Sequence, residues 1–302
     1  MNATTRTDGE LLIHQALLYG SEAEFTEAAA AFLTEGRAAD EPSVAIVSEE
    51  RLARLRKRLD DFEGHRAEDW FVAPARTLAA YLETASTQWW PRGRLRLLVE
   101  PLWTGLSAAE SREWRRLEAV LNVVLEGTRT WMICAYDATA LPADVLADAA
   151  RTHHGPDFVD PEIFYLAVSR TALAPPVEPV AHRGFTRGEL PGVRQFIGQA
   201  ATALGLQSTL ALVMAANEVA TNIIQHGGGQ GSVWVWSDGR SVLCDLLDPL
   251  HAFEDRLAGY IPPTLDQGYG AGMWAVRQLC DLVEIRSGSS GTVFRLHARL
   301  RP

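Results

Sequence analysis

A helical stretch near the end of the chain places polar side chains at the spacing that a metal-assisted reaction needs. Glu218, Asn222 and His226 recur at intervals of four residues, so they share one stripe of the helix predicted over 209–226. A carboxylate one turn before an amide oxygen suits Mg²⁺, which prefers hard oxygen ligands and keeps some of its water. The same spacing also fits an ordinary solvated helix face, and this stretch alone leaves both interpretations open.

Two later features predict an anion site. Asp248 follows the predicted apolar strand 241–247, and Gly268, Gly270 and Gly272 come just before a predicted helix. Glycines let the backbone approach an anion closely, and free amides at a helix start favour negative charge. Glycine-rich runs also occur in plain flexible loops. The order of polar helix, strand-end aspartate, glycine run and closing hairpin is more specific, and it predicts a nucleotide site.

The single lysine of the chain, Lys57, excludes two kinds of nucleotide site. It lies in the run 54–58 with no glycine-rich loop before it. A P-loop needs a lysine after such a loop, and a eukaryotic-type kinase needs a strand lysine paired with a helix glutamate. The phosphates of a nucleotide must therefore be held by backbone amides, arginine, small polar groups or a divalent ion.

The formal charge of −10 comes from the first 180 residues, which hold 28 acidic and 18 basic side chains, against ten of each afterwards. No basic stripe with interleaved aromatic residues occurs, so the charge pattern disfavours nucleic-acid binding. No signal peptide and no apolar run of about eighteen residues is found, and we expect a soluble cytoplasmic protein without membrane contact.

The cysteines and the histidine pair outside this helix are not predicted to form a site. Cys134, Cys244 and Cys280 lie far apart among apolar neighbours. They are predicted to be buried free thiols rather than a disulfide or zinc framework. His153 and His154 precede a Gly-Pro pair and are interpreted as loop residues.

The elements that must position these residues fall into two groups. Apolar runs alternating with amphipathic stretches predict an α/β domain with a mostly parallel sheet. Its predicted strands are 11–18, 43–48, 70–73, 94–100 and 130–136, and its predicted helices are 21–35, 49–59, 75–90 and 108–126. Prolines then mark a linker, and two helices followed by two hairpins predict an α+β sandwich. The predicted helices are 191–204 and 209–226, the hairpins are 232–247 and 282–298, and the domains are 1–170, linker 171–183 and 184–302.

Between Phe185 and Leu300 the sequence resembles the anti-sigma regulatory factors, which are serine-protein kinases of the GHKL (histidine kinase-like) ATPase superfamily with the Bergerat fold. The resemblance rests on the run 217–226, Asp248, the glycine run 268–272 and the closing Gly-Thr pair. It implies ATP and Mg²⁺ as cofactors. It also implies Glu218 as the catalytic group, Asn222 as the Mg²⁺ ligand, and cofactor contacts from Asp248, Gly268, Gly270, Gly272, Gly291 and Thr292.

The same resemblance implies a regulator of transcription in stress signalling. Such a protein binds a sigma factor or phosphorylates a serine or threonine of an anti-anti-sigma protein of the STAS type. The related kinases commonly form homodimers, and the sequence leaves the oligomeric state open. One departure is Pro249-Leu250, where the family usually has glycines. It favours the alternative of a catalytically silent protein-binding regulator with a degenerate nucleotide site.

The first half of the chain resembles, less specifically, the MEDS sensory domain of methanogen and methylotroph regulators. The matching pieces are 14–24, 32–36 and 99–103. The resemblance implies a RecA-type α/β sheet without a working P-loop and a sensory pocket lined by His14 and Tyr19 beside Trp103. Ordinary core packing of these three side chains is the competing interpretation.

Overall fold

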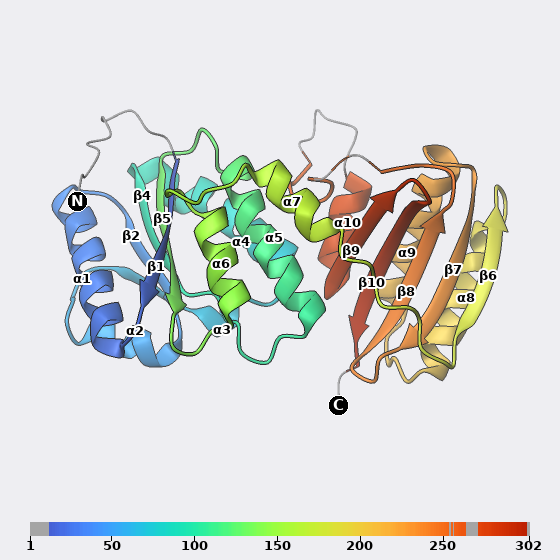
Figure 1. Cartoon of the computed structure of the whole chain (residues 1–302), viewed down its shortest axis with the longest axis horizontal. Coiled ribbons are helices and arrows are strands. Elements are labelled where there is room, and N and C mark those ends of the chain that lie inside the picture. The colour runs from blue at the N-terminus through green and yellow to red at the C-terminus, as the bar shows by residue number, and fades with distance from the viewer. Residues whose placement is uncertain (1–11, 254, 256, 264–270, 301–302) are drawn as a thin grey trace. The chain divides into compact units, whose positions relative to one another are not determined.

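Each half of the chain forms its own sheet with its own helices. The computed structural model describes residues 12–253, 255, 257–263 and 271–300 (Figure 1). The chain divides into two compact units, Met1–Tyr165 and Leu166–Pro302. Within the described residues, no helix combines the length and the apolar character that a bilayer crossing requires.

The first unit is built on a parallel sheet with strand order β1-β5-β4-β2-β3. All neighbouring strands in it run parallel, as predicted for an α/β domain. Two of its inner strands, β4 and β2, are buried along their whole length, because helices cover both faces. The strands are β1 (Leu12–Tyr19), β2 (Ser43–Val47), β3 (Glu63–Arg66), β4 (Leu95–Val99) and β5 (Thr130–Asp137).

Helices lie on both sides of this sheet (Figure 1). One side is packed by α1 and α2, whose Phe25, Leu33 and Leu55 join strand residues in one apolar cluster. The other side carries α4, α5 and α6. The helices are α1 (Glu22–Ala38), α2 (Glu49–Arg56), α3 (Ala67–Trp70), α4 (Pro74–Thr84), α5 (Ala108–Val124), α6 (Ala143–Thr152) and α7 (Pro161–Ser169). A π-helical turn, Ala85–Trp89, and a short 3-10 turn, Trp90–Arg92, follow α4.

The strand predicted over 70–73 is wrong, because β3 lies earlier and is polar. Trp70 ends α3, and its ring stacks on Trp89 with centroids 5.8 Å apart. The Phe71 ring contacts the Trp114 ring in a tilted arrangement, with centroids 5.4 Å apart. These half-buried aromatic side chains pack on other rings at the end of a helical turn, so their hydrophobicity does not indicate a strand.

The second unit is built on an antiparallel sheet with strand order β6-β7-β8-β10-β9, which agrees with the predicted α+β class. The predicted hairpins form, and the Asp238-Gly239 turn joins β7 and β8. An additional strand, β6, was not predicted and begins inside the proposed linker. The strands are β6 (Ala181–Thr186), β7 (Gln230–Ser237), β8 (Ser241–Asp248), β9 (Leu282–Gly288) and β10 (Gly291–Arg299).

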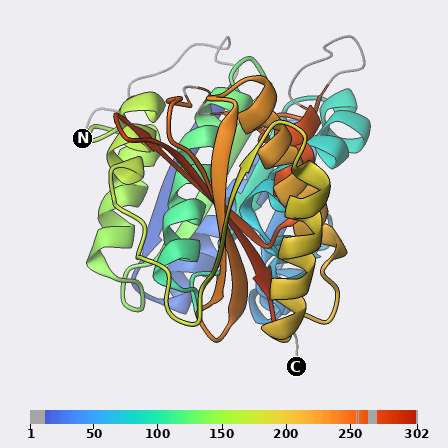
Figure 2. The same ribbon diagram turned by 90° about the vertical axis from the view of Figure 1, so that its right-hand side faces the viewer.

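One face of this sheet is covered by helices and the other is partly polar. The helices α8 (Leu190–Ala203), α9 (Leu210–Gln225) and α10 (Ala271–Leu279) contact the strands and share one apolar core with them (Figure 2). On the other face, Arg295 forms a two-pronged ion pair with Asp245, at 2.7 and 2.6 Å. The same guanidinium donates to the Ala174 carbonyl, so the segment before β6 lies along this face.

Candidate functional site

The polar stripe of α9 faces the start of α10. A Cβ added at Gly272 would lie 3.2 Å from Glu218 Oε2 and 3.8 Å from Asn222 Nδ2. Both side chains are half-buried, while Val219 and Ala220 between them are buried in the core. The helix therefore turns its apolar side to the sheet and its carboxylate and amide toward the first residues of α10.

A cavity of about 530 Å³ lies beside this stripe, and it is lined by residues of α9, β8, α10 and β10 and of the segments after α9 and β8. Asn222 and Ile223 come from α9, and Thr292 and Phe294 come from β10. The remaining lining residues are His226, Gly227, Asp248, His251, Phe253, Asp255, Leu257, Ala258, Gly259, Ile261, Pro262, Pro263, Gly272 and Met273. Asn222, Asp248, Gly272 and Thr292, predicted separately along the sequence, thus line one cavity, and Glu218 lies beside Gly272 but does not line it.

Asp248 is buried at the end of β8 and is held by backbone amides. Its Oδ1 accepts from the N–H groups of Leu250 at 3.1 Å and His251 at 3.2 Å, and Gly228 N–H donates to Oδ2 at 3.1 Å. A Cβ at Gly227 would come within 1.9 Å of Oδ2, so only glycine leaves room for this carboxylate. These contacts fix the orientation of the carboxylate at the cavity wall.

The Gly-Thr pair at the start of β10 has a structural task. Gly291 has φ +99°, and a Cβ there would lie 2.1 Å from the Asp248 carbonyl oxygen. Thr292 pairs with Asp248 across the sheet. Its hydroxyl donates to the His251 carbonyl at 2.8 Å and accepts from Phe253 N–H at 2.9 Å, so it ties down the loop after β8.

Arg277 is a residue that the sequence interpretation missed. It is buried in α10 and its guanidinium lies 3.9 Å from the centre of the Tyr260 ring. Its Nε donates to the Ala258 carbonyl at 2.8 Å. Ala258 and Gly259 line the cavity, so Arg277 holds this wall onto α10. An arginine in an otherwise apolar stretch of the helix was the available signal.

Two glycines and the Pro249-Leu250 pair are the remaining positions that the sequence singled out for this site. Gly268 and Gly270 lie outside the described residues. Pro249 and Leu250 are not among the described residues that line the cavity, and the Leu250 side chain is 68% exposed. The departure from the family pattern therefore does not fill the cavity with a hydrophobic side chain.

The three side chains predicted for a sensory pocket are not brought together. Tyr19 packs with Phe25 on the α1 side of the first sheet, and burial raises its pKa to about 12. Side chains alternate between the two faces of a strand, and His14 is five residues from Tyr19, so it points to the opposite face of β1. On that face, the α5 side, its ring lies 3.1 Å from the Asn122 side-chain oxygen. Trp103 contacts the Tyr136 ring, with centroids 5.9 Å apart. His14 and Tyr19 therefore do not share one pocket.

Three further groups surround His14, and none was predicted as a site. They are Glu118 from α5, Cys134 from β5, and His153 directly after α6. His153 lies in a loop as predicted, but its side chain is buried. Burial lowers its pKa well below the usual range, and burial raises the pKa of the Cys134 thiol well above it. The three cysteines are free and buried, as predicted.

Comparison with known families finds one match within each of the two units. Residues 13–154 match the MEDS family, described as "MEthanogen/methylotroph, DcmR Sensory domain". Residues 186–298 match the family described as "Histidine kinase-like ATPase domain". No curated protein matches the chain. The chain therefore carries a MEDS domain in its N-terminal part and a histidine kinase-like ATPase domain in its C-terminal part.

Proposed function

We propose that this chain is an anti-sigma regulator that binds ATP in the C-terminal cavity. It transfers the terminal phosphoryl group to a serine or threonine of an anti-anti-sigma protein of the STAS type, and it binds a sigma factor. The observation that carries the proposal is that Asn222, Asp248, Gly272 and Thr292 line one cavity. The MEDS domain supports a sensory input, and the likeness of 185–300 to the anti-sigma kinases supports these partners.

The residues of the cavity suit a purine base. Asp248 presents a carboxylate at a wall that also contains Ile223, Met273 and Phe294. An oriented acceptor among apolar side chains recognises a flat ring that carries an amino group. Leu250 and His251 donate to Oδ1, and Gly228 donates to Oδ2. Because a carboxylate oxygen accepts more than one hydrogen bond, Oδ2 can also accept from the amino group of a base.

The residues near α10 suit the phosphates. Bound Mg-ATP would supply the phosphoryl group and the cation that neutralises its charge. The Asn222 amide oxygen would hold Mg²⁺, with water and phosphate oxygens as the other ligands. Glu218, one turn earlier, would accept the proton of the attacking hydroxyl. The first amides of α10, which begins at Ala271, have no intrahelical partner and would bind phosphate oxygens.

A catalytically silent protein-binding module is the second candidate. The favouring observation is that Asp248 already accepts backbone hydrogen bonds from three residues, so it has a role in folding the loop without any ligand. In that case the cavity would not support phosphoryl transfer, and the same surface would only bind a protein partner.

Label transfer from ATP tests the catalytic proposal. The full-length chain is incubated with γ-labelled Mg-ATP and a candidate STAS-type antagonist. We expect Glu218→Gln to reduce transfer about 100-fold or more, because a positioned general base contributes at least this factor. Mg-ATP binding, measured by calorimetry, should remain unchanged. The matched control is Asn217→Ala, because the neighbouring Asn217 side chain accepts from Arg194 at 2.8 Å, away from the cavity.

Each outcome selects one account. Transfer that survives Glu218→Gln removes the assigned role of this carboxylate. Binding of the antagonist or a sigma factor by the wild-type chain without label transfer supports the silent module. Absence of Mg-ATP binding overturns the proposal for the cavity as a whole.

A further inference from the structure

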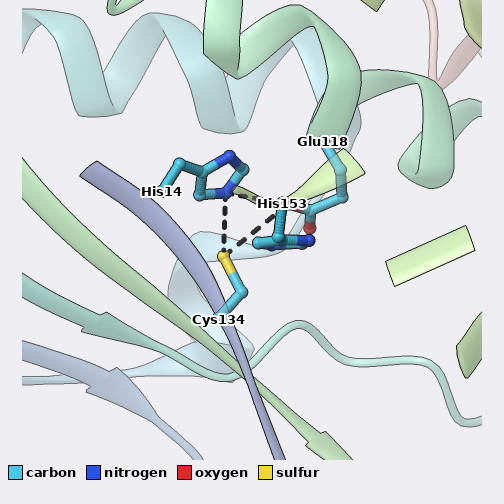
Figure 3. A group of neighbouring side chains, drawn as sticks. All are labelled: His14, Glu118, Cys134 and His153. Carbon is cyan, nitrogen blue, oxygen red and sulfur yellow. Dashed lines mark hydrogen bonds and ion pairs between the residues drawn. The ribbon is translucent and has the colours of Figure 1, made fainter. Parts of the chain in front are cut away.

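Four buried side chains of the first unit converge from four different elements. Figure 3 shows them pointing toward a common centre between the sheet and α5. One ligand atom from each lies within 4.8 Å of the others. We name this group the buried donor cluster, and its members are His14 (β1), Glu118 (α5), Cys134 (β5) and His153 (after α6). We propose that the buried donor cluster binds one divalent transition-metal ion, with Zn²⁺ the best match.

The spacing of the donor atoms is that of a tetrahedral metal site. Metal bonds of 2.0–2.3 Å to nitrogen, oxygen and sulfur place neighbouring ligand atoms about 3.3–3.8 Å apart. His14 Nε2 lies 3.3 Å from Cys134 Sγ and 3.5 Å from Glu118 Oε2. Glu118 Oε2 lies 3.6 Å from Cys134 Sγ and 3.5 Å from His153 Nε2. Four of the ligand–ligand edges therefore already have the required length.

The histidines are oriented as metal ligands are. Nδ1 of His153 donates to the Ala149 carbonyl at 2.8 Å, and Nδ1 of His14 lies 3.1 Å from the Asn122 side-chain oxygen. Asn122 is itself fixed, because its amide donates to the Glu118 and Thr152 carbonyls. With both Nδ1 atoms protonated, each Nε2 presents its lone pair to the cluster. Such outer hydrogen bonds set the tautomer and the ring orientation at metal sites.

Two groups of the cluster lack an adequate partner without a cation. His153 is 2% exposed, and its Nε2 is buried without a hydrogen bond. Glu118 is 5% exposed, and its Oε2 accepts from the Cys134 thiol, a weak donor, at 3.6 Å. Within the described part of the chain, only histidines lie within ion-pair distance of its carboxylate. A buried carboxylate and an unbonded ring nitrogen are costly, and a bound cation would satisfy both.

The donor set also selects the class of ion. Two neutral imidazoles, one thiolate and one carboxylate would give a site of zero net charge with a divalent ion, which suits a dry interior. Two imidazoles and a thiolate beside a single carboxylate favour Zn²⁺ or a similar first-row metal over Mg²⁺ or Ca²⁺, which prefer sites made of oxygen ligands. Four protein ligands close the coordination sphere, as in sites that stabilise or sense rather than catalyse. The inference is independent of the function proposed for the C-terminal cavity.

Cobalt substitution tests the site on the full-length chain. The purified protein is stripped with a chelator, checked by elemental analysis and titrated with Co²⁺. We expect one ion per chain, a thiolate-to-cobalt charge-transfer band and the intense visible bands of tetrahedral Co²⁺, all lost when Zn²⁺ is added. Cys134→Ser should abolish the charge-transfer band. Cys244→Ser, which removes a buried cysteine of the second sheet, is the matched control and should retain it.

Further variants guard against a fold effect. Glu118→Gln keeps the shape of the side chain but removes its charge, and we expect Co²⁺ affinity to fall at least tenfold while circular dichroism is unchanged. His153→Gln should weaken binding by a similar factor. A folded wild-type chain without the charge-transfer band overturns the proposal. So does Co²⁺ binding that Cys134→Ser, Glu118→Gln and His153→Gln all leave unchanged, which would mark an adventitious surface ion.

Discussion

The cavity of the second unit and the buried donor cluster of the first are assembled from the chain in different ways. Glu218 and Asn222 lie one turn apart in the same helix, and Asp248 at the end of β8 pairs with Thr292 near the start of the neighbouring strand β10. The cluster takes each donor from a different element, and His14 and Cys134 are 120 residues apart. Local spacing can reveal the first kind of site, whereas the second exists only once a parallel sheet has formed.

The two regions also differ in exposure. His251 and Asp255 at the cavity are exposed, so water can satisfy polar groups there and ligands can enter. Every residue of the buried donor cluster is buried. Its polar atoms therefore depend on one another or on an ion. We expect ligands of the cavity to exchange readily and an ion in the cluster to behave as part of the folded core.

The largest expected effect is the stabilisation of the first unit by a metal ion. Binding to the folded state alone adds about 4 kcal/mol when free Zn²⁺ exceeds its Kd a thousandfold, and somewhat less because unfolded cysteine and histidine also bind zinc. Hydrogen exchange of the full-length chain measures this locally. Amides of β1 and β5 should gain protection, while those of β8 and β10 should not change. Equal protection of both sheets would contradict a local site.

The next largest effect is expected at the cavity. Asp248→Asn should weaken Mg-ATP binding about 10- to 100-fold, because hydrogen bonds to charged groups contribute roughly 1.5–3 kcal/mol. An amide oxygen in the place of Oδ1 can still accept from Leu250, from His251 and, at 3.3 Å, from Gly228, so the loop should keep its fold. Asp238→Asn is the matched control, since Asp238 accepts backbone N–H bonds in the β7–β8 turn in the same way. Unchanged calorimetric affinity in Asp248→Asn would remove the purine assignment.

The fold was predictable where strands are apolar, including β1 and β9 at sheet edges, and failed at the two polar edge strands. β1, β2, β4, β5 and the two hairpins of the second unit follow apolar runs, because both faces or one face of these strands are buried. The two strands that were not predicted, β3 and β6, each form the edge of a sheet. Their residues are mostly half-buried or exposed, and their composition is polar. An edge strand can form with one partner and little burial, so a polar edge strand such as β3 or β6 carries a weak sequence signal.

The C-terminal site was predictable as a set of residues, but not the contacts that hold it. Nothing in the order of residues indicates that Gly227 must be small to admit Asp248, or that Arg277 secures the Ala258 wall. The buried donor cluster gives a weaker signal in the sequence. Glu118 and Asn122 are polar residues four apart on the buried face of α5. Because buried polar groups need hydrogen-bond or ionic partners, this pattern indicates further polar groups nearby.

A smaller effect is expected where α9 and α10 face each other. Gly272→Val would place a branched side chain 3.2 Å from Glu218 Oε2 and into the cavity, and we expect Mg-ATP affinity to fall about tenfold. Gly198→Ala in α8 is the control, because a Cβ there meets only ordinary contacts at 3.7 Å or more. That variant should stabilise its helix by about 0.5–1 kcal/mol and leave binding unchanged. Calorimetry and thermal unfolding separate the two outcomes.

The smallest effect is expected at the residue that departs from the family pattern. Leu250 is 68% exposed and does not line the cavity among the described residues, so Leu250→Ala should change Mg-ATP affinity less than about threefold. Leu250→Gly additionally loosens the backbone after Asp248. A tenfold gain in both variants would show that the leucine side chain obstructs the nucleotide. A gain in the glycine variant alone would show that backbone freedom in this loop limits binding, because only that variant extends the accessible conformations.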